Sequence, residues 1–201
     1  MFAFDRPIPT SCVHRTDFCD KTCFNVKLYK FYKGMSVKDV RNEEYWQQIT
    51  GEQFKKTLLR KRKQTKRVRF MTRGEALSTY HDVPRVEDIV LSTPATEYWL
   101  PTRAWRDTLL FAMVQSELKQ IPNLHILASM DPSNTPEEWE FVRANGWSTM
   151  YYGDDSLTYT PLGEKFFKCP KTFGHVVGAC SSCKRGCFEG HGRVDVHLSQ
   201  H

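Results

Sequence analysis

The 201-residue sequence lacks several features that would place it outside the soluble globular class. No run of apolar residues approaches the length of a membrane span. The first residues, MFAFDRPIPTSC, do not show the charged-then-apolar layout of a secretion signal. Low-complexity segments and internal repeats are also missing. We therefore expect a cytoplasmic protein that does not bind membranes.

What is present suits a packed core. Hydrophobic residues make up 40% of the chain and charged residues 26%, which is ordinary for a globular protein. The length allows one sizeable domain. We expect a single domain over residues 1–201, with an irregular cysteine-bearing arm at 1–35, an α/β core at 36–168, and a metal-binding loop with the last strand at 169–201.

Strand-like and helix-like segments alternate along the core. Segments rich in β-branched and aromatic residues are followed by segments with apolar residues at helical spacing. This order is typical of a parallel sheet with right-handed crossovers. The predicted fold class is α/β, either a partial (β/α) barrel or an open parallel sheet of about six strands. The predicted strands are RVRFMT (67–72), EYWLPT (97–102), LHILAS (124–129), WSTMYYG (147–153), KFFKCP (165–170) and RVDVHLSQ (193–200).

Several residues indicate where helices begin and end. Ser36 in SVKD, Thr50 in TGEQ and Thr135 in TPEE are typical N-terminal caps. Thr102 can cap the helix that follows the second predicted strand. Gly146 stands where a left-handed residue commonly ends a helix.

Charged side chains follow the predicted strands. In a parallel sheet these positions meet at the carboxyl edge, where α/β folds build their sites. Carboxylates can bind or deprotonate a substrate, and arginines can hold an anionic group. The expected partner is therefore a small anionic substrate or an electron donor. The predicted catalytic residues are Glu75, Asp131 and Asp154, with Arg73 and Arg103 as anion binders.

Four of the seven cysteines lie near the end of the chain, in the pattern C-x10-C-x2-C-x3-C. They are Cys169, Cys180, Cys183 and Cys187. In a reducing cytosol such clusters bind metal more often than they form disulfides. A single C-x2-C knuckle favours a 4Fe–4S cluster over the paired knuckles of a zinc ribbon, and zinc is the alternative. A dithiol redox pair and four unrelated thiols also stay open. Among the histidines, the best alternative ligands are His175 and His191.

The other three cysteines form a second set near the start of the chain, at Cys12, Cys19 and Cys23. Three cysteines can hold a cluster while leaving one iron open to a substrate or cofactor. Together with the four C-terminal cysteines they account for every cysteine in the sequence. We therefore predict metal-ligand roles for this set too, with a structural role as the alternative.

A strongly basic stretch runs from Lys55 to Arg69, where nine of fifteen residues are basic and none is acidic. One interpretation is a solvated helix face, and the other is a surface that binds nucleic acid. No aromatic residue is interleaved in it, so base stacking is not expected there. The nucleic-acid candidates are Lys61, Arg62, Lys63, Lys66 and Arg67.

Parts of the sequence resemble two known protein families. CDKTCF, followed by a strand that ends in MTRGEAL, resembles the radical S-adenosylmethionine barrel. In that family three N-terminal cysteines bind a 4Fe–4S cluster, and a GGE turn contacts the nucleotide cofactor. Cys19 and Cys23 match the first spacing, and residues 73–75 resemble the turn. The family's third cysteine corresponds to Val26, so S-adenosylmethionine binding is only weakly implied.

Over nearly its full length the chain resembles small phage-encoded proteins of unassigned function, through its early cysteines, the RGE turn and the terminal cysteine loop. That resemblance implies a cluster-binding barrel in the host cytoplasm or in the virion. We predict an iron–sulfur protein, which as an enzyme would use electron transfer in redox or radical-type chemistry. The alternative is a zinc-stabilised module that binds nucleic acid or is a structural part of the virion.

Overall fold

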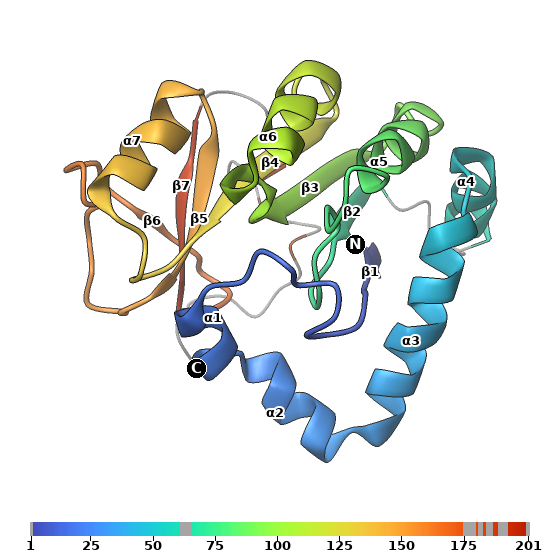
Figure 1. Cartoon of the computed structure of the whole chain (residues 1–201), viewed down its shortest axis with the longest axis horizontal. Helices are drawn as coiled ribbons and strands as arrows, with labels where there is room; N and C mark the ends of the chain where they lie inside the picture. Colours follow the sequence, from blue (N-terminus) through green and yellow to red (C-terminus); the bar gives the residue numbers. More distant parts are fainter. Residues whose placement is uncertain are drawn as a thin grey trace.

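The strands that the structure describes run parallel in one seven-stranded sheet, in the order β1-β2-β3-β4-β5-β7-β6 (Figure 1). The computed structural model describes residues 2–60, 66–174, 180, 183, 187, 188 and 193–199. The α/β fold class is confirmed, and the sheet is open rather than closed into a barrel. The strands are β1 (Phe2–Phe4), β2 (Arg67–Phe70), β3 (Glu97–Thr102), β4 (Leu124–Met130), β5 (Ser148–Gly153), β6 (Phe167–Lys168) and β7 (Asp195–Ser199).

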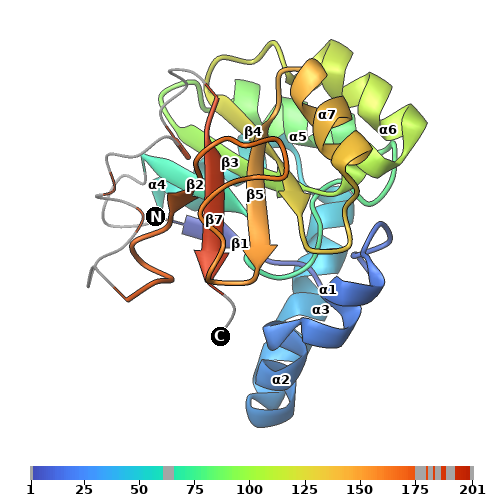
Figure 2. The same ribbon diagram turned by 90° about the vertical axis from the view of Figure 1, so that its left-hand side faces the viewer.

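Helices α5 (Asp82–Leu91), α6 (Thr108–Met113) and α7 (Pro136–Ala144) cover one face of this sheet, whereas α1 (Asp17–Thr22) and α2 (Phe24–Phe31) lie beyond the carboxyl ends of its strands (Figures 1 and 2). We call the face opposite α5–α7 the helix-free face. Parallel neighbours joined by right-handed crossovers place their connecting helices on a common side. Within the described residues no helix is long and apolar enough to cross a bilayer. The other described helices are α3 (Lys33–Gln48), α4 (Gly51–Leu59), η1 (Ala104–Arg106) and η2 (Val114–Leu118).

Three of the predicted helix signals are confirmed. Thr50 and Thr135 each form a full capping box, at the starts of α4 and α7. In both, the hydroxyl accepts from the third helical N–H while that residue's side chain accepts from the cap N–H. Gly146 adopts a positive φ of 70° just after α7, which glycine reaches without the steric cost of a β-carbon.

Two other helix signals are wrong. Helix α3 already begins at Lys33, and Ser36 lies inside its first turn with its hydroxyl on the Lys33 carbonyl. Thr102 ends β3 and does not cap α6. The cap is Asp107, whose carboxylate accepts from the Leu110 N–H at 2.9 Å. The short η1 helix separates the strand from α6, so the hydroxyl of Thr102 caps only the Ala104 N–H.

The segment at 1–35, expected to be an irregular arm, contains regular structure. It holds β1, α1, α2 and the start of α3. Strand β1 has only three residues, which is too short to show a periodicity. Helix α2 leaves much of its apolar surface exposed, so its sequence carries no clear buried stripe.

Side chains alternate between the two faces of the sheet, as the pleat requires. Val68 and Phe70 of β2 join the large core under the helices, whereas Trp99 of β3 joins a smaller cluster on the other face. That smaller cluster includes Phe188 and three of the C-terminal cysteines. The helix-free face is therefore covered partly by the C-terminal loop.

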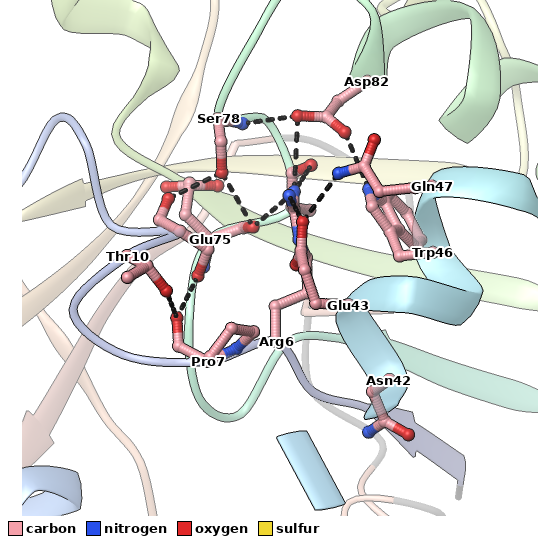
Figure 3. A network of polar contacts seen from close by, with 12 residues as sticks. Arg6, Pro7, Thr10, Asn42, Glu43, Trp46, Gln47, Glu75, Ser78 and Asp82 are labelled. Carbon is pink, nitrogen blue, oxygen red and sulfur yellow. Dashed lines mark hydrogen bonds and ion pairs between the residues drawn. The ribbon is translucent and has the colours of Figure 1, made fainter. Parts of the chain in front are cut away.

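A buried arginine joins the N-terminal segment to α3 and α5 (Figure 3). The Arg6 guanidinium donates to both oxygens of Glu43 at 2.6 Å and reaches Asp82 at 3.3 Å. It also donates to the backbone carbonyls of Glu75 and Ala76 at 3.1 Å. Charge-assisted, bidentate contacts of this kind fix geometry as well as energy. The loop after β2 is thereby fixed relative to α3.

Candidate functional site

A cavity of about 180 Å³ opens at the carboxyl ends of the strands, on the helix-free face. Its walls combine the segment between β1 and α2 with residues that follow or end β2, β3, β4, β5 and β7. This is the edge at which the sequence predicted a site. The lining residues that carry chemistry are Cys12, His14, Arg15, Cys19, Cys23, Arg69, Glu75, Arg103 and Tyr152.

The three N-terminal cysteines all line this cavity. The pKa of the Cys12 thiol is raised to about 12, mainly by burial and also by the nearby charges of Glu75, Cys19 and Cys23. Burial also raises the pKa of Cys19, although the Arg103 guanidinium opposes the shift. The three sulfurs are thus close enough to sense one another's charge, and a bound cation would favour their thiolate forms.

The positions of these cysteines follow from local structure. Thr16 caps α1 by accepting from the Cys19 N–H at 3.0 Å, and Cys23 lies at the junction between α1 and α2. Gly74 lets the loop after β2 approach the Cys12 segment closely. It has a φ of 78°, and a β-carbon there would lie 2.5 Å from the Ser11 hydroxyl. Because glycine has no β-carbon, the Ser11 hydroxyl can approach this loop and accept from the Glu75 N–H at 3.1 Å.

Glu75 is a buried carboxyl in the cavity wall. Burial raises its pKa, and this outweighs the hydrogen bonds that favour its ionised form. Its oxygens accept from the backbone N–H of Arg103 at 2.9 Å and from that of Leu77 at 3.2 Å. A carboxyl with a raised pKa can hold a proton near neutral pH and donate it.

Asp131 has the opposite character. Burial alone would raise its pKa, but the Arg103 guanidinium and hydrogen bonds from Ser133 and Thr16 lower it overall. The Arg103 Nη2 lies 2.7 Å from one carboxylate oxygen, and the Thr16 hydroxyl donates to the same oxygen at 2.5 Å. Arg103 also lies close enough to Cys19 to oppose the rise in the pKa of its thiol. The Asp131 carboxylate thus stays charged and orients the arginine beside the thiol.

Three of the five predicted catalytic residues do not line the cavity. Asp131 lies behind Arg103, with which it forms an ion pair at 2.7 Å, and the other two point elsewhere. Arg73 turns toward α3, where its guanidinium donates to Asp39 at 2.7 and 2.9 Å and pairs with Asp5 at 2.9 Å. Asp154 accepts from the Ser156 N–H at 2.8 Å in the exposed loop after β5. The structure therefore brings together Glu75, Arg103 and Asp131 with the cysteines.

The four C-terminal cysteines form a separate group on the same face of the sheet. The pKa of Cys187 is raised to about 12, mainly by burial and also by the nearby Cys169, Cys183 and Cys180. The Cys183 N–H donates to the Cys180 carbonyl at 3.3 Å, which closes the C-x2-C turn. Cys169, Cys180 and Cys187 contact the apolar cluster around Trp99. His175 and His191 lie outside the described residues.

Two arginines of β2 link this loop to the sheet. Arg67 donates to the carbonyls of Cys180 and Cys183 at 3.0 and 2.6 Å, so it supports the cysteine turn. Arg69 lies over the Trp99 ring at 4.3 Å and also lines the cavity. Its Nε is shielded from solvent and has no hydrogen-bond partner, and burial lowers its pKa. Of the other nucleic-acid candidates, Lys66 is exposed, whereas Lys61, Arg62 and Lys63 lie outside the described residues.

Neither group shows a preformed metal site. Among the residues that the structure describes, no three histidine, cysteine, aspartate or glutamate side chains are arranged to hold a metal ion. All seven cysteines are described, and all are free thiols. Metal or cluster binding at either group therefore stays a prediction.

A family model described as Gene product 88 matches residues 2–183. The chain belongs to the Gene product 88 family. The match covers both cysteine groups except Cys187, and it confirms the resemblance to a phage-type family of unassigned function. It gives no support to the radical S-adenosylmethionine resemblance. No curated protein and no solved structure matches the chain.

The sequence did not single out four of the residues that line the cavity of this Gene product 88 family member: His14, Arg15, Arg69 and Tyr152. His14 lies beside the cysteines, and its Nε2 is shielded without a hydrogen-bond partner. Arg69 and Tyr152 lie within strands and face the cavity through the alternation of the pleat. That alternation was visible in the sequence, but the helix-free face could not be assigned before the topology was known.

Proposed function

We propose that the protein is an iron–sulfur protein whose cavity at the carboxyl edge is a redox or radical-type active site for a small anionic substrate. The observation that carries this proposal is the position of Cys12, Cys19 and Cys23 on the wall of one cavity that also contains Glu75 and Arg103. Three thiols beside an open cavity suit a metal centre that must still contact a substrate.

The surroundings fit an anionic metal centre. Thiolate-ligated iron–sulfur clusters carry net negative charge, and the cavity offers three arginines, Arg15, Arg69 and Arg103. Arg69 is the most informative, because its Nε lacks a hydrogen-bond partner in a shielded place. Buried charged groups are normally paired. An anionic centre in the cavity, or at the C-terminal cysteines whose charges act on Arg69, would provide that pairing.

The chain's own residues supply binding and proton transfer. A 4Fe–4S cluster, when bound, supplies single electrons. Arg103, oriented by Asp131, can bind an anionic group of the substrate. Glu75 can donate a proton to a reduced substrate, because burial raises its pKa and so favours the protonated form. The pKa shifts of these two carboxyl groups are opposite in direction. They support Glu75 as the general acid and Asp131 as the group that stays charged.

Zinc in the same cavity is the second candidate, favoured by His14. This histidine, with its unpartnered Nε2, would complete a Cys3His donor set, which is a common zinc site. The protein would then be colourless and would bind zinc through the N-terminal cysteines. The nucleic-acid role suggested for residues 55–69 is weaker, because Arg67 is used to support the cysteine loop.

Metal analysis of anaerobically prepared protein tests the proposal. We expect iron and acid-labile sulfide, with absorbance near ~400 nm that dithionite bleaches. Replacing Cys12, Cys19 and Cys23 together by serine should remove part of the iron and the associated paramagnetic resonance signal. Val13→Ser is the matched control, since Val13 is exposed between Cys12 and His14 and contributes no thiol. Colourless protein with stoichiometric zinc would refute the iron–sulfur assignment.

A further inference from the structure

The α2–α3 projection, which we define as residues 24–41, exposes apolar side chains away from the core. It extends from the sheet in both views (Figures 1 and 2). At its tip Phe31 is 79% exposed and Tyr32 60%. Val37 and Val40 are also exposed. Single exposed apolar residues are ordinary, but a group of them on one projection indicates an interaction surface.

The same projection carries unpaired positive charge. Its basic residues are all exposed, and within the described residues none of them makes an ion pair. Asp39, the acidic residue of this stretch, is buried and pairs with Arg73. The local charge is therefore strongly positive. The basic residues are Lys27, Lys30, Lys33, Lys38 and Arg41.

The base of the projection is fixed by buried polar contacts. The Tyr29 hydroxyl of α2 donates to Asp39 of α3 at 2.7 Å. Asp39 in turn accepts from Arg73, and Glu43 accepts from Arg6 in the network of Figure 3. The exposed side chains therefore sit on a scaffold that needs no ordering when a partner binds, which reduces the entropic cost of binding.

We propose that the α2–α3 projection binds single-stranded nucleic acid. Exposed aromatic rings give unpaired bases a stacking surface, and lysines between them neutralise the phosphates. At the tip Lys30, Phe31, Tyr32 and Lys33 are consecutive, so both kinds of contact are available side by side. The tip residues 30–33 on which the proposal rests do not line the cavity, so it stands or fails independently of the iron–sulfur assignment.

Other partners fit this surface less well. A helix that lies on a membrane separates an apolar face from a basic one. In the projection the lysines instead flank the two adjacent aromatic residues at the tip, so charge and apolar surface lie side by side. Duplex DNA hides the faces of its bases, so Phe31 and Tyr32 would have nothing to stack on. Single strands are the polyanion that uses both properties.

Fluorescence anisotropy with the full-length protein tests this. The probe is a labelled oligothymidine of about 20 nucleotides, compared with the matching duplex and with phosphatidylcholine–phosphatidylglycerol vesicles. We expect Phe31→Ala/Tyr32→Ala to weaken single-strand binding by about tenfold or more, and the duplex to bind more weakly. Lys30→Ala/Lys33→Ala should lower the slope of log affinity against log salt by about one to two.

Matched controls lie elsewhere on the surface. Tyr159→Ala removes an exposed aromatic residue and Lys171→Ala an exposed lysine, and both should leave binding unchanged. Circular dichroism of each variant checks the fold. The proposal is overturned if the oligothymidine does not bind, if the aromatic variant binds as the wild type does, or if only the vesicles bind. A change of oligomeric state in Phe31→Ala/Tyr32→Ala without loss of nucleic-acid binding would also overturn it.

Discussion

The two cysteine groups share one face of the sheet but lie in different surroundings. Cys12, Cys19 and Cys23 line a cavity among charged side chains. Cys169, Cys180 and Cys187 contact an apolar cluster around Trp99. Structural metal sites are closed by protein ligands, whereas catalytic sites keep a position open. Under the proposal of metal binding, the first group would be the reactive centre and the second would stabilise the fold.

The largest expected difference concerns stability. Cys183→Ser should remove metal from the C-terminal group and lower the free energy of unfolding by on the order of 3 kcal/mol, about 6–12 °C in Tm. Cys19→Ser should lose cavity metal but change stability by only about 1 kcal/mol. Metal content and thermal unfolding of both variants provide the measurement. Equal losses of stability would remove the distinction between the two groups.

Next in size is the replacement of Glu75. Glu75→Ala leaves the Arg103 and Leu77 N–H groups without their acceptor in a buried place, at a cost of about 1–3 kcal/mol for each unsatisfied group. Glu75→Gln keeps an oxygen acceptor and should lose less than half as much. Chemical denaturation measures both. If the two variants are equally unstable, the hydrogen bonds are not what holds this wall of the cavity.

The pH dependence of stability sharpens the comparison further. The folded-state pKa of Glu75 is raised. Its contribution to the free energy of unfolding is therefore fully present below the unfolded-state pKa of 4.5 and is lost as pH rises through the folded-state pKa. Glu75→Gln should therefore flatten the rise in stability as pH falls from neutral toward 4.5. Urea unfolding across this range checks the slope. An unchanged slope would mean that Glu75 is ionised in the folded protein.

The smallest effect is expected at His197 of β7, which is buried among the Tyr151, Phe166 and Phe173 rings under the helices. Burial and the Lys168 charge lower its pKa. The contribution of His197 to the free energy of unfolding is therefore present above its unfolded-state pKa of 6.5 and is lost as pH falls through the folded-state pKa. This pH dependence is opposite in sign to that of Glu75. His197→Phe should reduce the loss of Tm between pH 7.5 and pH 5.5. Each 1 kcal/mol of unfolding free energy that the variant retains corresponds to roughly 2–4 °C in Tm. A steeper acid loss in the variant would contradict this.

Much of the core could be predicted from the sequence because its signals are local. The six predicted strands all exist, and the capping boxes at Thr50 and Thr135 depend on residues three positions apart. The placement of Glu75, Arg103 and Asp131 at one edge follows from parallel strands alone. These features needed no knowledge of distant partners.

What the sequence could not predict depends on long-range pairing. Arg73 and Glu75 belong to one turn, yet only Glu75 faces the cavity, because Asp39 of α3 binds Arg73. The distance between these partners along the chain hides the pairing. Strand β1 was missed for a similar reason, since its three residues become a strand only beside β2.

The lengths of the outer strands limit how far the sheet can pair with another chain. An open sheet presents two outer strands whose unpaired amides can recruit another chain. Here the central β4 has seven residues, while the outer β1 and β6 have three and two. The two outer strands therefore present few unpaired backbone amides, which disfavours edge-to-edge pairing with the sheet of another molecule.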